Sequence, residues 1–148
     1  MIVTDTSLRW QSALIIAQAS IEYAEKNKLR VCVSVLDRHG HPLVQIRVNN
    51  TPFPCTEISQ NKAYTAVSFG FPTQDWNRRL EGKPSLLQGL SQQKRMVMFG
   101  GGLPVRFDDE IIGSVGVSGA SEQQDEACAQ AGVIAFQRYS ENHHHFCD

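Results

Sequence analysis

Lys62 is a residue whose type and position could support chemistry. It falls within a stretch predicted to be a helix from Thr56 to Phe69, on the same side as the apolar residues Ile58 and Ala66. Lysines are rarely buried without a partner, so a lysine on an apolar face is unusual. Such a lysine can act as a base or an amine nucleophile, or it can pair with a ligand carboxylate. Alternatively, its stem lies along the face and its ammonium reaches solvent or a carboxylate of the chain.

The stretch before the last predicted helix is the best candidate for binding a small anion. It consists of Ser118, Gly119, Ala120 and Ser121. A helix N-terminus carries free amides and about half a positive charge, so the amides of residues 119 to 121 could hold a carboxylate or a phosphate. In the alternative interpretation, Ser121 and Gln124 form a capping box and Gly119 makes a tight turn into the helix. The acidic residues 122, 125 and 126 favour this alternative, because they would repel an anion.

A run of three glycines precedes the strand that begins near Leu103. Gly100, Gly101 and Gly102 lack the Lys-Ser/Thr pair of a P-loop, and no GxGxxG motif follows a strand. The run is therefore typical of a glycine-rich link between strands. We include Gly101 and Gly102 among the ligand-binding candidates, because a residue without a Cβ lets a ligand or another backbone come close.

Histidines are weaker candidates for metal or haem ligation. His39 and His41 flank Gly40 at the tip of a predicted hairpin, and a run that includes His143 and His145 lies near the end of the sequence. Histidines in turns are mostly ordinary polar residues, and no carboxylate lies at an obvious metal spacing. The CxxCH motif is absent, which excludes covalent c-type haem attachment and leaves non-covalent haem open. No catalytic triad can be assembled.

The elements that would position these residues indicate an α+β domain. The expected helices cover residues 7–26, 56–69, 73 or 74–80, one or two turns from 85, and a final segment capped by Ser121. The expected strands cover residues 31–36, 43–48, 96–99, 103–107 and 111–118. Because the hairpin connections are too short for parallel crossovers, we expect a five-stranded antiparallel sheet with N-terminal, middle and C-terminal helices.

Two helices show faces that predict close packing. In the first, an apolar stripe is formed by Trp10, Leu14, Ala17, Ile21 and Ala24. Ile15, Ile16 and Tyr23 lie off this stripe, which is a first indication of a partner subunit. In the last, small residues recur at Ala127, Cys128, Ala131, Gly132 and Ala135, so this helix is expected to pack closely on the sheet.

The length, the net charge and the distribution of apolar residues limit the classes of function. A chain of 148 residues fits one domain, here residues 1–148, and a net charge of -1 provides no basic excess for nucleic acid. No apolar run approaches the roughly 20 residues that cross a bilayer. The N-terminus lacks the regions of a secretory signal, so we expect a cytoplasmic protein with reduced thiols.

Three motifs together resemble the GlcG/HbpS family, which also includes the C-terminal domain of PduO, and within that family the chain resembles an OrfY-type member. The motifs are Gly100-Gly101-Gly102-Leu103-Pro104, then Ile112 to Ala120, then Gln124-Asp125-Glu126. Asp37-xx-Gly40 and Lys62-Ala63-xx-Thr65-Ala66 match other shared positions. The resemblance implies a profilin-like α/β/α fold, assembly into homo-oligomers and genomic company with diol, glycerol or glycolate utilisation. Some members bind haem, but their haem histidines lie outside the shared motif, so no ligand is carried over.

Two hypotheses of function follow. In the first, the protein is an oligomeric accessory protein whose pocket takes haem, another tetrapyrrole or a small acidic metabolite. That pocket would be formed by the Lys62 helix, the Gly100 link and the corner from Ser118 to Ser121. In the second, it is an enzyme that acts on a small hydroxy- or oxo-compound, with Lys62 as a polar anchor or base.

Overall fold

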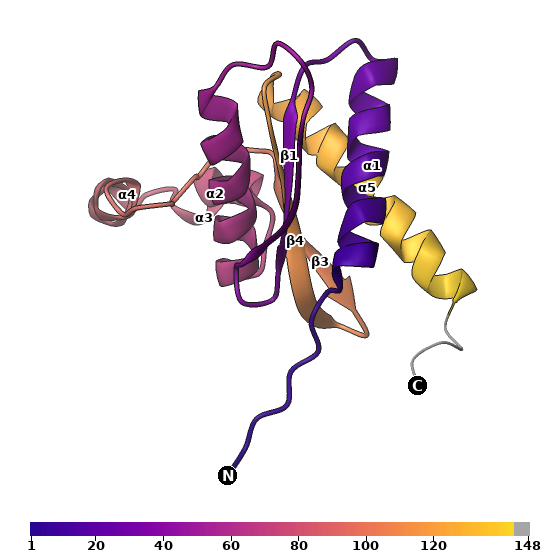
Figure 1. The fold of residues 1–148 in the computed structure, drawn as a ribbon. Coiled ribbons are helices and arrows are strands. Elements are labelled where there is room, and N and C mark those ends of the chain that lie inside the picture. The colour runs from indigo at the N-terminus through magenta and orange to yellow at the C-terminus, as the bar shows by residue number, and fades with distance from the viewer. Residues whose placement is uncertain (144–148) are drawn as a thin grey trace.

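The computed structural model describes residues 1–143 and arranges them in three layers (Figure 1). The helices are α1 (Trp10–Lys26), α2 (Pro54–Phe69), α3 (Trp76–Arg79), α4 (Pro84–Ser91) and α5 (Glu122–Asn142), with a 3-10 turn, η1 (Thr73–Asp75), before α3. The strands are β1 (Cys32–Asp37), β2 (Pro42–Arg47), β3 (Gly102–Phe107) and β4 (Glu110–Ser118). Helices α1 and α5 cover one face of the sheet, and α2 covers the other. The expected α+β class is confirmed.

The sheet has four strands in the described residues rather than the expected five. Their order is β2-β1-β4-β3, and every neighbouring pair is antiparallel. Residues 96–99 do not form a strand. The amide of Val97 donates to Thr65 Oγ1 at 3.1 Å, and the amide of Gly100 donates to Glu122 Oε1 at 2.9 Å. Side chains of α2 and α5 thus accept hydrogen bonds from amides that would donate to a neighbouring strand if this segment were part of the sheet.

The two faces of the sheet have different linings. Valines of β1 and β4 join α1 and α5 in the apolar core; they are Val33, Val35, Val115 and Val117. The face towards α2 carries small and hydroxyl residues instead. Ser34 Oγ shares a hydrogen bond of 2.8 Å with Ser59 Oγ, and Ser114 Oγ donates to the carbonyl of Ala63 at 2.6 Å. Helix α2 therefore lies close to the backbone of the sheet.

Helix α1 buries a face that overlaps only in part with its predicted apolar stripe, since Ala17 and Ala24 belong to both. Trp10 is 57% exposed and Leu14 is 41% exposed. The buried face is formed by Ala13, Ile16, Ala17, Ser20 and Ala24. This narrower face fits α5, where a Cβ added at Gly132 would meet Ser20 Oγ and the Ile16 carbonyl. The closeness of the two helices thus decides which face of α1 is buried.

Several helix starts differ from their predicted positions. Helix α1 begins at Trp10 rather than residue 7, because the backbone at Leu8 is held against β4, where the Leu8 amide donates to the Ile112 carbonyl at 2.8 Å. Helix α2 begins at Pro54, two residues before the predicted cap Thr56. At α5 the prediction is confirmed: Ser121 and Gln124 form a complete capping box.

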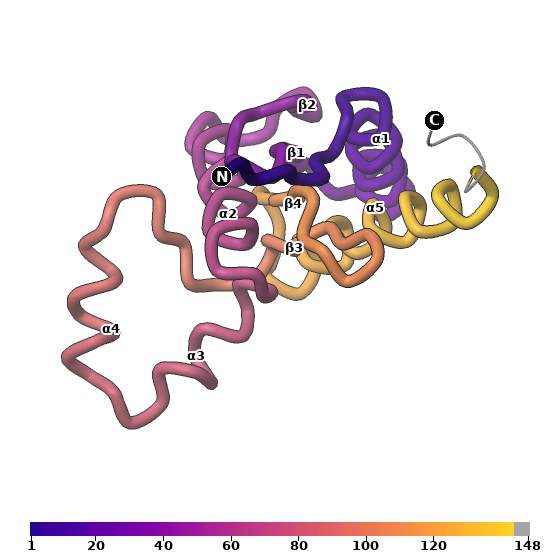
Figure 2. The backbone as a smooth tube through the Cα atoms, turned by 90° about the horizontal axis from the view of Figure 1, so that it is seen from below, coloured from indigo at the N-terminus to yellow at the C-terminus, as the bar shows by residue number. Residues whose placement is uncertain are grey.

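Residues 73–95 leave the body of the molecule and return to it, and we call this segment the arm. Figure 2 shows it as an open loop that stands off the three layers, with α4 at its outer side. Its base is anchored, since Thr73, Trp76 and Leu80 are buried. No residue of α4 is buried. The arm is therefore an extension that is anchored at its base and whose helix α4 buries no residue in the described chain.

Candidate functional site

Lys62 lies in a closed corner between α2, the end of β4 and the start of α5. Its side chain is 1% exposed. The ammonium Nζ donates to the Val117 carbonyl at 2.8 Å and forms an ion pair with Asp125 Oδ2 at 3.0 Å. It also lies 5.0 Å from the centroid of the Phe99 ring, within the range of a cation–π contact. The sequence leaves open whether the Lys62 ammonium meets a ligand, solvent or a carboxylate of the chain. In the structure its partners are groups of the chain itself.

Asp125 is the partner that sequence reasoning missed. Its other oxygen, Oδ1, accepts the amide hydrogen of Ala120 at 2.9 Å, and its side chain is 4% exposed. Burial raises the pKa of the Asp125 carboxyl, whereas the Lys62 ammonium and the Ala120 amide act in the opposite direction. The one available signal was the presence of carboxylates in the turn after Ser121, which the sequence analysis uses only as an argument against a bound anion.

Gly101 and Gly102 lie against Lys62, as predicted for members of one corner. A Cβ at Gly101 would come 2.6 Å from Lys62 Nζ, and one at Gly102 would come 2.5 Å from the Lys62 carbonyl. The amide of Gly102 donates to Thr73 Oγ1 at 2.9 Å. Gly101 also has a φ of 127°, which side chains rarely adopt. The glycines thus admit the lysine side chain and the α2 backbone.

The stretch from Ser118 to Ser121 lies at the same corner. Gly119 has a φ of 142°, and a Cβ there would meet the Arg30 carbonyl. The amide of Ala120 donates to Asp125 Oδ1, and the amide of Ser121 donates to Gln124 Oε1 at 3.1 Å. An anion bound at these two amides would have to displace side chains of the chain's own helix.

The candidate histidines are distributed over two distant surfaces. His39 and His41 lie at the β1–β2 turn, where both amides donate to Asp37 Oδ1 at 2.9 and 3.0 Å. His143 stacks on Tyr139 with a centroid distance of 4.2 Å. His145 lies outside the described residues. Within residues 1–143, no group of three or more His, Cys, Asp or Glu side chains could hold a metal ion.

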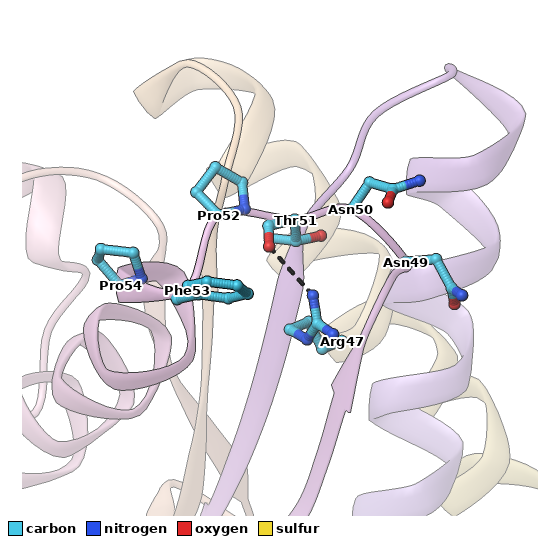
Figure 3. Close-up of a pocket in the computed structure, with 7 residues that line it drawn as sticks. All are labelled: Arg47, Asn49, Asn50, Thr51, Pro52, Phe53 and Pro54. Atoms are coloured by element: carbon cyan, nitrogen blue, oxygen red, sulfur yellow. Dashed lines mark hydrogen bonds between the residues drawn. The ribbon is translucent and has the colours of Figure 1, made fainter.

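A depression between the end of β2 and the start of α2 was not predicted. It has a volume of about 620 Å³ and is lined by Arg47, Asn49, Asn50, Thr51, Pro52, Phe53 and Pro54. Arg47 Nη1 donates to the Thr51 carbonyl at 3.1 Å, and the Phe53 ring points towards the Arg47 side chain (Figure 3). Phe53 is 85% exposed. The Arg47 cation and the open Phe53 ring could hold a carboxylate attached to an apolar body, while the Asn49 and Asn50 side chains point away from them (Figure 3).

Fold and corner together define a class of protein. It is a three-layer α+β domain in which a glycine-rich strand pair receives a helix that carries a buried lysine. The family model described as "Haem degrading protein HbpS-like" matches residues 8–134. The chain therefore belongs to the HbpS-like family, and the resemblance found in its motifs is confirmed. In the described residues, no helix is long and apolar enough to cross a membrane.

Individual relatives support the same assignment. The chain is 38% identical over 122 residues to an uncharacterized 15.0 kDa protein of the dhaT-dhaS intergenic region of Citrobacter freundii, covering 81% of this chain and 85% of that protein. The crystal structure of Klebsiella pneumoniae protein ORFY has 33% identity and a TM-score of 0.85, covering 92% of this chain and 94% of ORFY. A PduOC:heme complex has 30% identity and a TM-score of 0.76, covering 88% and 95%.

Proposed function

We propose that this protein is an oligomeric accessory protein that binds a carboxylate-bearing ligand and serves diol, glycerol or glycolate utilisation in the cytoplasm. Its profilin-like architecture provides a rigid frame for such a role. The name of the Citrobacter relative refers to a dha region, and a solved relative was crystallised with haem. Haem carries carboxylates on a flat apolar body, and a small acidic metabolite shares the carboxylate chemistry.

The observation that carries the proposal is the depression beside Arg47. Guanidinium groups bind carboxylates in a forked geometry, and Arg47 has N–H groups beyond the one donated to Thr51. The exposed ring of Phe53 offers an apolar surface beside it. By contrast, the Lys62 corner is filled by the chain's own groups, so we do not assign Lys62 to ligand binding or to catalysis.

The depression fits the carboxylates of haem but does not provide a ligand for its iron. None of the seven lining residues is a histidine, cysteine, methionine or tyrosine. His41 precedes β2 and Arg47 ends it, so six residues of strand separate them by roughly 20 Å. An axial ligand would have to come from another copy or another part of the chain.

A titration with haemin tests the proposal. We expect a Soret band that survives gel filtration for the wild type and a dissociation constant raised at least tenfold by Arg47→Ala. Arg30→Ala is a matched control, because Arg30 is also exposed and lies outside the depression. Variants at His39, His41 and His143 test whether one of these histidines is an axial ligand.

Calorimetry with iron-free protoporphyrin and with succinate separates the two sources of carboxylate. Succinate binding without porphyrin binding would favour the small metabolite. The proposal is rejected if none of the three compounds binds at millimolar concentration, or if Arg47→Ala binds as well as Arg30→Ala does.

A further inference from the structure

Two cysteines lie on the face of the sheet that α2 covers. Cys32 is fully buried at the start of β1, and Cys55 is 7% exposed in the first turn of α2. Neither belongs to the apolar core that α1 and α5 form with the other face of the sheet, whereas Cys128 does. All three are free thiols. The described chain therefore holds a pair of free thiols on one side of the sheet and a single one on the other side.

The contacts next to this pair show how α2 runs over β1. Ser34 Oγ of β1 lies 2.8 Å from Ser59 Oγ of α2, so short side chains meet across the interface. Leu36, two residues later in β1, pairs with Ser114 of β4. Ser114 Oγ in turn donates to the carbonyl of Ala63, which lies four residues after Ser59. Helix α2 therefore runs in the same direction as β1, and four helix residues accompany two strand residues.

The same spacing places Cys32 opposite Cys55. Cys32 precedes Ser34 by two strand residues, which corresponds to about 6.6 Å. Cys55 precedes Ser59 by four helix residues, which corresponds to about 6 Å. The two displacements agree to within about 1 Å, and the side chains of cysteine and serine differ only in their terminal atom. The two thiols therefore hold positions equivalent to those of the two hydroxyl groups that are in contact one repeat further on.

The surroundings of the two thiols differ in a way that gives them different reactivity. Burial raises the pKa of the Cys32 thiol, and hydrogen bonds with the side chains of Ser59 and Thr56 act in the opposite direction. The nearby Cys55 thiol raises this pKa further. Because the thiolate is the nucleophile, a buried neutral thiol reacts slowly with reagents in solution. Cys32 is thus shielded, and Cys55 is the thiol that an oxidant meets first.

We propose that Cys32 and Cys55 are a redox pair, which forms a disulfide between β1 and α2 when a small disulfide such as oxidised glutathione reacts with Cys55. The Cys55 thiolate attacks one sulfur of the small disulfide, breaks its S–S bond and releases one small thiolate. The Cys32 thiolate then attacks the Cys55 sulfur of the mixed disulfide and releases the second small thiolate. Two protein thiols are oxidised, one small disulfide is reduced to two thiols, and the two protons lost by the cysteines are taken up by these thiols.

The disulfide would join two walls of the depression. Cys32 is the register partner of Arg47. Cys55 directly follows Pro54, the last residue that lines the depression. The segment 48–54 would then lie between two points that are covalently linked, so oxidation should slow the hydrogen exchange of its amides. Disulfides in reducing compartments are usually transient and catalytic or redox-sensing, so the pair would report oxidising conditions at this site.

Peptide mapping of the full chain tests the proposal, because trypsin leaves each of the four cysteines on a different peptide. The folded protein is incubated with oxidised glutathione, its remaining thiols are alkylated, and it is then digested. We expect the peptides 31–38 and 48–62 to be joined, with a mass about 2 Da below the sum of the two reduced peptides, and dithiothreitol to separate them. Cys128→Ala is the matched control and should form the same link, because Cys128 lies on the other face of the sheet.

Two single variants test the order of the steps. Cys32→Ser should stop at a mixed disulfide with one glutathione on Cys55, whereas Cys55→Ser should leave the buried Cys32 unmodified. Hydrogen exchange of residues 48–54 should slow on oxidation in the wild type and in neither variant.

Three results would overturn the proposal. They are a wild type without the link between peptides 31–38 and 48–62, a link that forms only in urea, and glutathione on Cys32 of Cys55→Ser as fast as on Cys55 of Cys32→Ser. Because the link is read from peptide masses, failure of every ligand titration would reject only the proposed function.

Discussion

The Lys62 corner and the arm handle charge and apolar surface in opposite ways. In the corner, a lysine and an aspartate are removed from water and bonded to groups of the same chain. In the arm, leucines and basic side chains face solvent on a helix with no buried residue. The corner is complete in one copy, whereas the outer helix of the arm has no buried residue in the described chain. An unusual buried residue is thus not necessarily a ligand site.

The largest expected effect concerns the buried ion pair. Lys62→Met should lower the free energy of unfolding by about 3–5 kcal/mol, because Asp125 would be left buried without its counter-charge. Urea denaturation followed by circular dichroism measures the loss. The double variant Lys62→Met/Asp125→Leu should recover most of it, because both charges are then absent. A loss below about 1 kcal/mol for the single variant would mean that the corner admits water or a ligand.

A smaller loss is expected where α2 meets the sheet. Gly116→Ala should cost about 1–3 kcal/mol by overpacking, because the added methyl would meet the Ser59 carbonyl and the Ala63 amide. Gly89→Ala in α4 is the control, since nothing lies within 4 Å of the added methyl. In a helix this change should stabilise by about 0.5–1 kcal/mol. Thermal melts measure both effects. If the two substitutions shifted the melting temperature in the same direction, the contrast between the packed α2 face and the open α4 helix would be wrong.

Hydrogen exchange should separate the two regions without mutation. The amides of residues 84–91 should exchange faster than the amides of α2 around Lys62, because α4 is short and none of its residues is buried. Mass spectrometry of peptides from the two segments measures both rates. Equal protection of the two segments would contradict this difference between the corner and the arm.

The smallest expected effect lies at the boundary between the regions, at Glu126. Burial raises the pKa of this carboxyl from 4.5, and the charges of Asp75 and Glu122 raise it further. Its Oε2 is buried without a hydrogen-bond partner in the described chain. A raised folded pKa means that ionised Glu126 destabilises the fold above that pKa and that this penalty disappears below pH 4.5. Glu126→Gln should therefore raise the melting temperature at pH 8 and leave it nearly unchanged at pH 4. An equal change at both pH values would exclude ionisation as the cause.

Local patterns in the sequence predicted what depends on neighbours along the chain. The two hairpins, the capping box at Ser121 and the position of Lys62 on a packed face were all predicted. The Lys62–Asp125 pair joins residues 63 positions apart, and no local pattern reports such a contact. Residues 96–99 have the composition of a strand, but the amide of Val97 donates to the Thr65 side chain of α2 and that of Met96 donates to the Gln93 carbonyl. The depression at Arg47 was missed because it is shaped by the meeting of a strand end and a helix start.

The glycines that admit α2 have a consequence for how relatives of this protein are compared. Gly101, Gly102 and Gly116 are fixed by the backbone and side-chain atoms that a methyl group would strike. A motif built on them identifies chains with the same internal fit, whatever those chains bind. Arg47 and Phe53 are exposed and can be exchanged without disturbing that fit. Ligand preference can therefore diverge between relatives while the motif stays the same, so the motif is a marker of architecture, and specificity has to be compared at the exposed positions.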